Sequence, residues 1–496
     1  MKTVRLVSFV PLFVWLGGCA VAPVSDSQSW SNGAVSSSSS AESLRTTQAA
    51  DILDDLRLVP GVVEVTELAS TIEGARFFFL RLEQPIDHRA PAGGNFTQRL
   101  TLIFRSREAP MVLATTGYDI PVDAPYQSEP AYLLNANQLL MEHRFFGESA
   151  PAPLDWTKLD IFQGAQDEHR VVQAFKPLFA KKWLTTGGSK GGMTAIYHRM
   201  FHPNDVDATV PYVAPTSFGR NDPRYVAFVE NVGTADCRDK LKGFQQEILT
   251  RRSEIEPLFL ADAAQYQTAY DRTGIHWAVD YAVAEAPFTF WQYGSADNCA
   301  LIPARTATTD EIFQFLAGIY FGSVANSFSD AVLDYYAPYY YQAATELGGP
   351  GVALRHLRGL VSPGFRDMPQ DLPPLDVKKP FNFISMPIVA TWMYATAERM
   401  LLVYGENDPW SSGASTVRNA NDSFRYNAPA GNHGSGIADL PQAEQVEAHA
   451  HLSRWMGVPI AVAPTVAATP GIHAVQRPFE SLALWRQRRA ERRQVK

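Results

Sequence analysis

The segment Gly187-Gly-Ser-Lys-Gly191 is the feature that most constrains the fold of this chain. An apolar run at Lys182–Thr186 predicts a strand before it, and the residues after it favour a helix. Between a strand and a helix, this spacing is typical of a nucleophile elbow, where Ser189 occupies a strained turn and the glycines let strand and helix approach. The segment therefore predicts an α/β fold with Ser189 at the carboxyl edge of a sheet. The alternative is a glycine-rich turn whose serine only caps the helix.

The partners that such a serine needs follow in the order acid, then histidine. Met400–Gly405 predicts a strand, Asp408 comes directly after it, and His433 lies in a glycine-rich loop further along. We therefore predict Ser189 as nucleophile, His433 as general base and Asp408 as the acid that orients the imidazole. Glu406 is the alternative acid.

An oxyanion hole is expected beside the serine. One donor would be the backbone N–H of Lys190, directly after Ser189. The second would be an N–H of Gly117 or Tyr118, in the loop after the predicted strand Met111–Thr115. The Tyr118 hydroxyl is a further candidate donor.

The N-terminal residues predict export. Two positive charges are followed by an apolar run, Leu6–Trp15, that is short for a membrane span. The sequence Leu16-Gly-Gly-Cys19 resembles a bacterial lipobox, which implies a signal peptide over 1–18, lipidation of Cys19 and a Ser-rich tether over 19–50. The expected location is then the bacterial cell envelope, anchored to the outer membrane or held in the periplasm. A plain secretory signal, giving a secreted protein, is the alternative.

Two further cysteines, Cys237 and Cys299, complete the three in the chain. In an oxidising compartment such a pair predicts one disulfide, with two buried thiols as the alternative. The chain has no C-x-x-C or H-E-x-x-H pattern, so we predict no metal and no cofactor. The net charge is −8 and no basic stripe is interleaved with aromatic residues, which argues against nucleic-acid binding.

The hydrophobic pattern predicts an α/β architecture with a mixed sheet. Four alternating or apolar runs follow one another without intervening helices and predict that the sheet begins with antiparallel strands. These runs are Val62–Leu68, Ala75–Leu82, Phe96–Phe104 and Met111–Thr115. Strands and helices then alternate, which predicts parallel βαβ units, at Gln138–Glu142, Ala165–Phe179, the segment around Ser189, and Ala208–Val213.

The same pattern divides the chain into segments. We expect residues 51–223 and 396–460 to form the two parts of one α/β-hydrolase domain that ends in a helix over Gln442–Met456. Residues 224–395 carry long helical patterns, many aromatic residues and both cysteines, and predict a helical cap inserted between those parts. Residues 461–496 end in an arginine-rich stretch and are predicted to be a peripheral tail.

Short motifs follow one another in a specific order between residues 60 and 455: Gln84-Pro-Ile-Asp-His88, Glu142-His-Arg-Phe-Phe-Gly147, Gly187-Gly-Ser-Lys-Gly-Gly-Met-Thr194, Val210-Pro-Tyr-Val-Ala-Pro215, Trp291-Gln-Tyr-Gly294 and Tyr404–Trp410. In this order they resemble the secreted tripeptidyl aminopeptidase family of actinomycetes. More remotely they resemble the Pro-X carboxypeptidase and dipeptidyl peptidase II family.

The resemblance implies an α/β-hydrolase with a helical insertion that releases short peptides from free N-termini, with tripeptides and cleavage after proline as the finer expectation. It also implies a carboxylate that binds the substrate ammonium, and Glu142 and Glu129 are the candidates. In the alternative, Glu142 pairs with Arg144 or another internal arginine. Trp410 is a further substrate-binding candidate. The expected partners are thus peptides with a free N-terminus and, through Cys19, a membrane.

Two other functions fit the same residues. An esterase or lipase would use the same triad, but Thr115-Thr-Gly-Tyr118 lacks the H-G-G-G segment of many such esterases. A surface lipoprotein that binds peptides without cleaving them is the second alternative.

Overall fold

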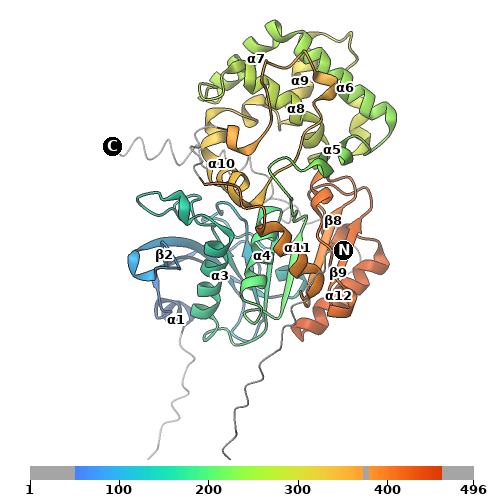
Figure 1. Ribbon diagram of the computed structural model, residues 1–496. Coiled ribbons are helices and arrows are strands. Elements are labelled where there is room, and N and C mark those ends of the chain that lie inside the picture. Colours follow the sequence, from blue (N-terminus) through green and yellow to red (C-terminus); the bar gives the residue numbers. More distant parts are fainter. Residues whose placement is uncertain (1–50, 373–378, 461–496) are drawn as a thin grey trace, which may run out of the picture. The chain divides into compact units, whose positions relative to one another are not determined.

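A computed structural model describes residues 51–372 and 379–460 of the chain (Figure 1). The predicted signal peptide, the lipidation site Cys19, the Ser-rich tether and the tail over 461–496 lie outside the described residues. Among the helices that are described, none is both long enough and apolar enough to cross a membrane.

The described residues contain a nine-stranded mixed sheet in the order β1-β2-β3-β5-β4-β6-β7-β8-β9. The first three strands and β5 pair antiparallel, and all pairs from β5 onward are parallel. The strands are β1 Val62–Leu68, β2 Arg76–Pro85, β3 Asn95–Phe104, β4 Met111–Thr115, β5 Asn137–Met141, β6 Trp183–Gly188, β7 Ala208–Tyr212, β8 Leu401–Gly405 and β9 Phe424–Ala428. Strands β4, β5, β7 and β8 are buried along their whole length, as expected where helices cover both faces of a parallel sheet.

Different helices cover the two faces, because successive strand residues point to opposite sides. In β8, Leu401 and Val403 pack in a cluster with α2 (Glu129–Leu133) and α12 (Gln442–Met456). Leu402 and Tyr404 pack on the other side, with α3 (Ile161–Phe175), α4 (Lys190–Phe201) and α11 (Ser385–Ala395). The short α1 (Ile52–Arg57) packs with β2 and β3 in a third cluster. The sheet is therefore the middle of three layers.

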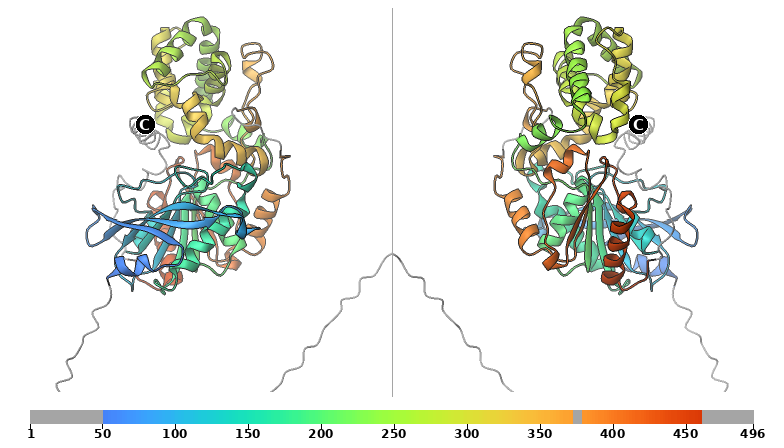
Figure 2. Two further views of the ribbon diagram at one scale, coloured as in Figure 1. Left: turned by 90° about the vertical axis from the view of Figure 1, so that its left-hand side faces the viewer. Right: turned by 90° about the vertical axis from the view of Figure 1, so that its right-hand side faces the viewer.

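Between β7 and β8 the chain forms a separate group of helices with its own core. These are α5 Pro223–Val229, α6 Ala235–Thr250, α7 Arg252–Gln265, α8 Ile275–Tyr293, α9 Thr309–Ile319 and α10 Asp330–Gln342. Side chains of α6–α9 form one hydrophobic cluster, and Figure 2 shows these helices bundled apart from the sheet. A disulfide joins Cys237 in α6 to Cys299 in the short 3-10 helix η3 (Ala296–Leu301). We refer to α5–α10, their connections and the residues that follow α10 up to Leu372 as the cap.

The predicted strands agree with the structure to within three residues at each end, and three expectations need correction. The strand Met111–Thr115 was expected in the antiparallel start of the sheet, but β4 pairs parallel with β5 and β6, because the long connection from β4 to β5, which includes α2, forms a crossover. The helix expected over Ala165–Phe179 runs over Ile161–Phe175, because the Asp160 side chain caps its N-terminus by accepting the Gln163 N–H at 3.0 Å. The cap was expected to extend to residue 395, but α11 packs against α4 and β8 rather than on the cap core. Its apolar face resembles a cap helix in sequence, and only packing distinguishes the two.

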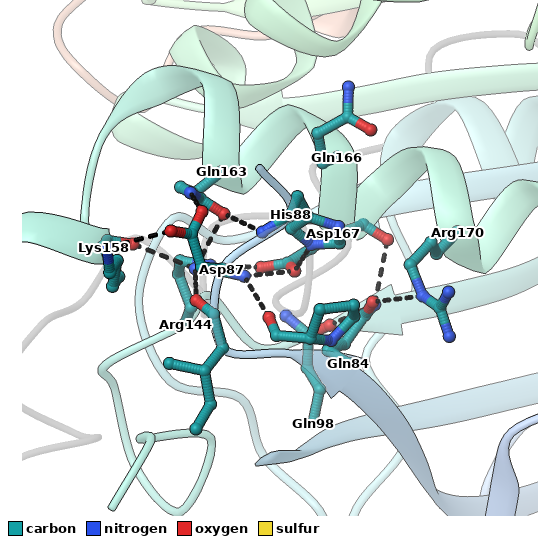
Figure 3. Close-up of polar contacts among 12 residues, drawn as sticks. Gln84, Asp87, His88, Gln98, Arg144, Lys158, Gln163, Gln166, Asp167 and Arg170 are labelled. Carbon is teal, nitrogen blue, oxygen red and sulfur yellow. Dashed lines mark hydrogen bonds and ion pairs between the residues drawn. The ribbon is translucent and has the colours of Figure 1, made fainter. Parts of the chain in front are cut away.

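Two motifs of the sequence meet in a buried polar network on α3 (Figure 3). Arg144, in the loop after β5, donates to both carboxylate oxygens of Asp167 at 2.6 Å. The same guanidinium donates to the carbonyl oxygens of Pro85 and Ile86, at 3.2 and 3.1 Å, and His88 Nε2 lies 2.7 Å from Asp167 Oδ1. Arg144 and Asp167 are both fully buried. The network therefore fixes the loop after β5 to the turn after β2.

Candidate active site

Ser189 lies on a strained turn between β6 and α4. Its φ is 54° and its ψ is −124°, a conformation that L-residues seldom adopt. The flanking glycines allow the strand and helix to touch there. A Cβ on Gly187 would lie 2.4 Å from the Gly191 carbonyl carbon, and one on Gly191 would lie 2.1 Å from the Thr115 carbonyl oxygen. The G-x-S-x-G spacing is therefore a steric requirement of this turn.

The three residues predicted as a triad lie within hydrogen-bond distance of one another. His433 Nε2 is 2.8 Å from Ser189 Oγ, and His433 Nδ1 is 2.7 Å from Asp408 Oδ2. Asp408 and His433 are buried, and the second Asp408 oxygen accepts the Trp410 N–H at 3.0 Å. The alternative acid, Glu406, is exposed, and its carboxylate accepts the Ala430 N–H instead. The geometry thus joins Asp408, and not Glu406, to the imidazole.

The loop expected to complete an oxyanion hole packs against the residue after the serine. Lys190 is the first residue of α4, where a backbone N–H has no acceptor within the helix. Its ammonium donates to the Gly117 carbonyl oxygen at 2.7 Å, and the Nζ atom lies over the rings of Tyr118 and Phe146. Burial lowers the pKa of Lys190 well below its usual value. The side chain of Lys190, which we did not assign from the sequence, therefore ties the loop to the elbow.

A cavity of about 940 Å³ opens above the serine, between the sheet edge and the cap. Its lining includes Ser189, His433 and Trp410, together with the predicted oxyanion residues Tyr118 and Lys190. Aromatic residues of the cap also line the cavity: Phe288, Tyr293, Tyr320, Phe328, Tyr335, Tyr336, Tyr339 and Tyr340. In the described part of the chain, five carboxyl groups line the cavity against one arginine and one lysine. Such a cavity suits an extended, partly apolar ligand with a positive charge.

Glu142, expected to bind the substrate amine, does not line this cavity. It is fully buried and forms an ion pair with Arg99, whose Nε donates to it at 2.7 Å. The Ser149 hydroxyl and N–H also donate to its carboxylate, at 2.6 and 3.1 Å. Burial raises the pKa of Glu142, and the Arg99 guanidinium opposes that effect. The structure therefore corresponds to the alternative in which an internal arginine pairs with Glu142, with Arg99 in place of Arg144.

Glu129 and Trp410, the other two substrate-binding candidates, both line the cavity. The Glu129 carboxylate accepts the backbone N–H groups of Ile437 and Ala438 at 2.8 and 2.9 Å, so it fixes the loop that follows His433. Trp410 packs edge-on against Phe288, with ring centroids 5.1 Å apart, and its indole lies 6.0 Å from the His433 ring.

Two cap residues on the cavity wall have no recognisable signal in the sequence. Glu285 lies on α8 and Asp367 lies in the segment between α10 and α11, and both line the cavity. Burial and the neighbouring Asp367 carboxylate raise the pKa of Glu285 well above its usual value. A glutamate inside a helix and an aspartate in a loop are ordinary in sequence, and only the folded cap brings them together.

One group of described residues has the spacing of metal ligands, at the far end of α4 from Ser189. The ligand atoms of His169, His202 and Asp205 lie within 4.8 Å of one another. The rings of His169 and His202 stack 3.9 Å apart, and Asp205 Oδ2 lies 2.7 Å from His169 Nδ1 and 3.0 Å from His198 Nε2. Stacked rings cannot both direct a lone pair in their planes at one ion, and hydrogen bonding accounts for the group.

A mixed sheet with a strained serine at a strand–helix turn, followed in the chain by a buried Asp–His pair that reaches this serine, defines an α/β-hydrolase. The chain belongs to the S37 peptidase family, because the family model described as PS-10 peptidase S37 matches residues 45–494. The prolyl tri/tetrapeptidyl aminopeptidase of Streptomyces mobaraensis is 40% identical over 432 residues, which cover 86% of this chain and 89% of that protein.

These matches confirm the resemblance to the tripeptidyl aminopeptidase family and the expectation of a serine peptidase. Two solved structures also align with most of the chain. The peroxisomal alpha-beta-hydrolase Lpx1 of Saccharomyces cerevisiae is 11% identical with a TM-score of 0.32, covering 83% of this chain and 98% of its own. The esterase LipA of Xanthomonas oryzae is 12% identical with a TM-score of 0.33. The alignment covers 79% of this chain and 96% of LipA. At these TM-scores the fold assignment rests on the strand order above.

Proposed function

We propose that this chain is an exported serine aminopeptidase that releases tri- and tetrapeptides ending in proline from free N-termini. The observation that carries the proposal is the Ser189–His433–Asp408 chain of hydrogen bonds at the floor of an acid-rich cavity under a cap. The 40% identical Streptomyces protein, whose name states that activity, supports the peptide length and the proline preference.

In this mechanism the Ser189 hydroxyl attacks the carbonyl carbon of the third or fourth substrate residue, and His433 Nε2 takes its proton. Asp408 holds the imidazole by its Nδ1 and stabilises the imidazolium. The backbone N–H of Lys190 and an N–H of the Gly117–Tyr118 loop donate to the oxyanion. His433 then protonates the leaving amine, and a water molecule activated by His433 hydrolyses the acyl-enzyme.

The wall beside the triad supports proline at the cleaved bond. Trp410 and Phe288 line the cavity with ring centroids 5.1 Å apart, and the Trp410 indole lies 6.0 Å from the His433 ring. The buried Tyr225 packs against both rings, at 5.7 and 6.1 Å, and supports them. Flat aromatic faces pack well against a pyrrolidine ring, which has no rotamers to lose when it is buried. A flexible, polar side chain would bury there at a higher free-energy cost.

The test is a product profile on a mixture of linear peptides that contain proline at different positions. We expect the wild-type enzyme to release N-terminal tri- and tetrapeptides ending in proline, identified by mass spectrometry. Ser189→Ala should lower turnover by about 10⁴-fold or more while the protein stays folded. N-acetylated peptides should be poor substrates. Rapid cleavage of acetylated peptides, or of short acyl esters in preference to all peptides, would replace the proposal with an endopeptidase or an esterase.

Export and lipidation are part of the proposal. The lipobox-like Leu16-Gly-Gly-Cys19 supports them, as does the Cys237–Cys299 disulfide, since disulfides persist in oxidising compartments. Mass spectrometry of the mature N-terminus should find a diacylated Cys19, and Cys19→Ser should yield an unacylated protein that leaves the membrane fraction. A mature wild-type protein without lipid would rule out the anchor and leave the peptidase activity untouched.

A further inference from the structure

Two carboxyl groups of the cap face the cavity and interact directly with each other. Glu285 on α8 and Asp367, from the segment before α11, both line the cavity, and burial and the Asp367 carboxylate raise the pKa of Glu285. Asp367 Oδ2 is buried and accepts no hydrogen bond in the described part of the chain. The neighbouring Arg366 pairs with Asp371 instead, at 2.6 Å. The pair therefore has unused capacity for a positively charged hydrogen-bond donor.

The buried hydroxyl of Tyr281 lies on the same part of the cap. Tyr281 precedes Glu285 by one helical turn on the same face of α8, and its side chain is fully buried. Its hydroxyl has no hydrogen-bond partner among the described residues, although buried hydroxyls are usually paired. The Tyr281 ring packs edge-on against Phe365, two residues before Asp367, with ring centroids 5.0 Å apart.

The other cavity carboxylates already have donors. Glu129 accepts the N–H groups of Ile437 and Ala438. Glu148 pairs with Arg81 at 2.7 Å, and Asp119 accepts the Tyr335 hydroxyl at 2.6 Å. A cationic ligand would have to displace these contacts, whereas Asp367 Oδ2 has no hydrogen-bond donor to lose among the described residues.

Helix α8 sets the separation between this pair and the triad. The face that carries Tyr281 and Glu285 continues through Thr289 to Tyr293, whose ring packs edge-on against His433 at 6.2 Å. The eight residues from Glu285 to Tyr293 rise about 12 Å along the helix. Three extended peptide residues span at most about 10–11 Å and four about 13–14 Å.

We propose that Glu285 and Asp367 form the subsite that binds the α-ammonium of the substrate's N-terminus, and that their separation from Ser189 sets the length of the released peptide. This inference rests on the aminopeptidase function proposed above and names the residues responsible for it. An ammonium has three N–H donors, which the two carboxyl groups can accept, and its positive charge would favour their ionised forms.

The test compares three probes: Ala-Ala-Pro-p-nitroanilide with a free N-terminus, its N-acetylated form, and p-nitrophenyl acetate. The double variant Glu285→Gln/Asp367→Asn should lose roughly 100-fold in kcat/KM on the free-amine peptide, because a bound ammonium is left without its counter-charge. Its rate on the ester should stay within about twofold, since the triad is unchanged. Discrimination between the free and acetylated peptides should largely disappear.

A second variant tests the sign of the charge. In Glu285→Lys the subsite carries a cation, so a succinylated peptide, which ends in a carboxylate, should gain in kcat/KM relative to the free-amine peptide. The control is Glu256→Gln on α7, which removes a cap carboxylate that pairs with Arg252 and His276 and does not line the cavity. This control should keep the wild-type preference for the free amine.

The outcomes separate the inference from the function on which it rests. If the wild-type enzyme cleaves free and acetylated peptides equally well, the aminopeptidase function itself fails. If the wild-type enzyme discriminates and the double variant retains that discrimination, the Glu285–Asp367 subsite is overturned while the function stands. Equal losses on the peptide and the ester would also overturn it, because they would mean a structural role.

Discussion

At the scale of single residues, the triad could be predicted from the order of its residues in the chain. The roles of the buried carboxylates could not, because those roles depend on partners that only the fold brings together. Ser189, Asp408 and His433 were recognisable because each follows a predicted strand or lies in a glycine-rich loop. Glu142 lies in a similar setting, but its partner Arg99 is on β3, and that pairing is visible only in the folded sheet. Glu285 and Asp367 could not be recognised in the sequence either, because they approach each other only in the folded cap.

The choice between the two candidate acids gives a direct prediction. Asp408→Asn should reduce kcat/KM by about 10⁴-fold, because the amide favours the wrong imidazole tautomer. The matched change Glu406→Gln should leave kcat/KM close to the wild-type value, since that exposed carboxylate contacts only the Ala430 N–H. Steady-state rates on one peptide substrate measure both, and the reverse ranking would assign the acid to Glu406.

Asp367 predicts a pH-dependent stability. Burial raises its pKa from 3.8 to about 7, and Glu285 and Asp371 are the groups that act on it. A carboxyl whose pKa is higher in the folded state stabilises the fold below its unfolded pKa, and this contribution is lost as the pH rises through the folded pKa. Asp367→Asn should therefore gain in Tm relative to the wild type between pH 4.5 and pH 8. Thermal scans at both values measure it, and a constant difference in Tm would contradict the shift.

At the scale of elements, the sequence motifs supply the residues through which distant segments contact one another. The turn after β2, the loop after β5 and helix α3 meet at Arg144 and Asp167 (Figure 3). Burial raises the pKa of Asp167, but the Arg144 guanidinium outweighs burial and the pKa lies below its usual value. Each motif was visible in the sequence, whereas their common network was not, since no local pattern specifies which segments meet.

Removing the arginine of the Arg144–Asp167 ion pair should destabilise the fold. Arg144→Met should lower the free energy of unfolding by about 3–5 kcal/mol, because it leaves the fully buried Asp167 without its counter-charge. The exposed Arg170, which contacts Gln84 in the same network, supplies the control, and Arg170→Met should change stability by no more than about 0.5 kcal/mol. Urea unfolding measures both, and similar values for the two variants would show that the buried pair is not important for stability.

The Cys237–Cys299 disulfide links two segments of the cap. It closes a loop with a sequence separation of 62 residues between α6 and η3. In the chain-entropy model such a loop contributes about 4 kcal/mol. Cys237→Ser/Cys299→Ser should therefore unfold at lower urea concentration than the wild type, and an unchanged midpoint would show that the cap core alone holds these segments.

At the scale of the whole molecule, the strand positions and the presence of an inserted helical cap were predictable from the alternation of patterns, whereas the parallel pairing of β4 and the end of the cap were not. The apolar helix α11 could belong to either layer until its contacts with α4 were known. The cavity between cap and sheet is likewise a property of the assembled layers, because its walls come from segments as far apart as Thr71 and Gly436.

The position of the cavity under the cap predicts which peptides can enter. A linear peptide can insert one end under the cap, whereas a head-to-tail cyclic peptide of the same sequence offers neither an end nor an ammonium. We expect the linear form of a proline-containing peptide to be hydrolysed and the cyclic form to remain intact, as followed by mass spectrometry. Opening of the cyclic peptide at a comparable rate would show that the cavity admits internal segments.

The order of the strands also has a consequence for biosynthesis. Ser189 is made 244 residues before His433, and the whole cap is synthesised between them. At about 5–20 residues per second, the growing chain carries its serine for roughly ten to fifty seconds before the base exists. Only when β8 and β9 have added to the edge beyond β7 does the imidazole reach the hydroxyl. A half-made chain therefore has the nucleophile without its base, and we expect peptidase activity only once the chain is nearly complete.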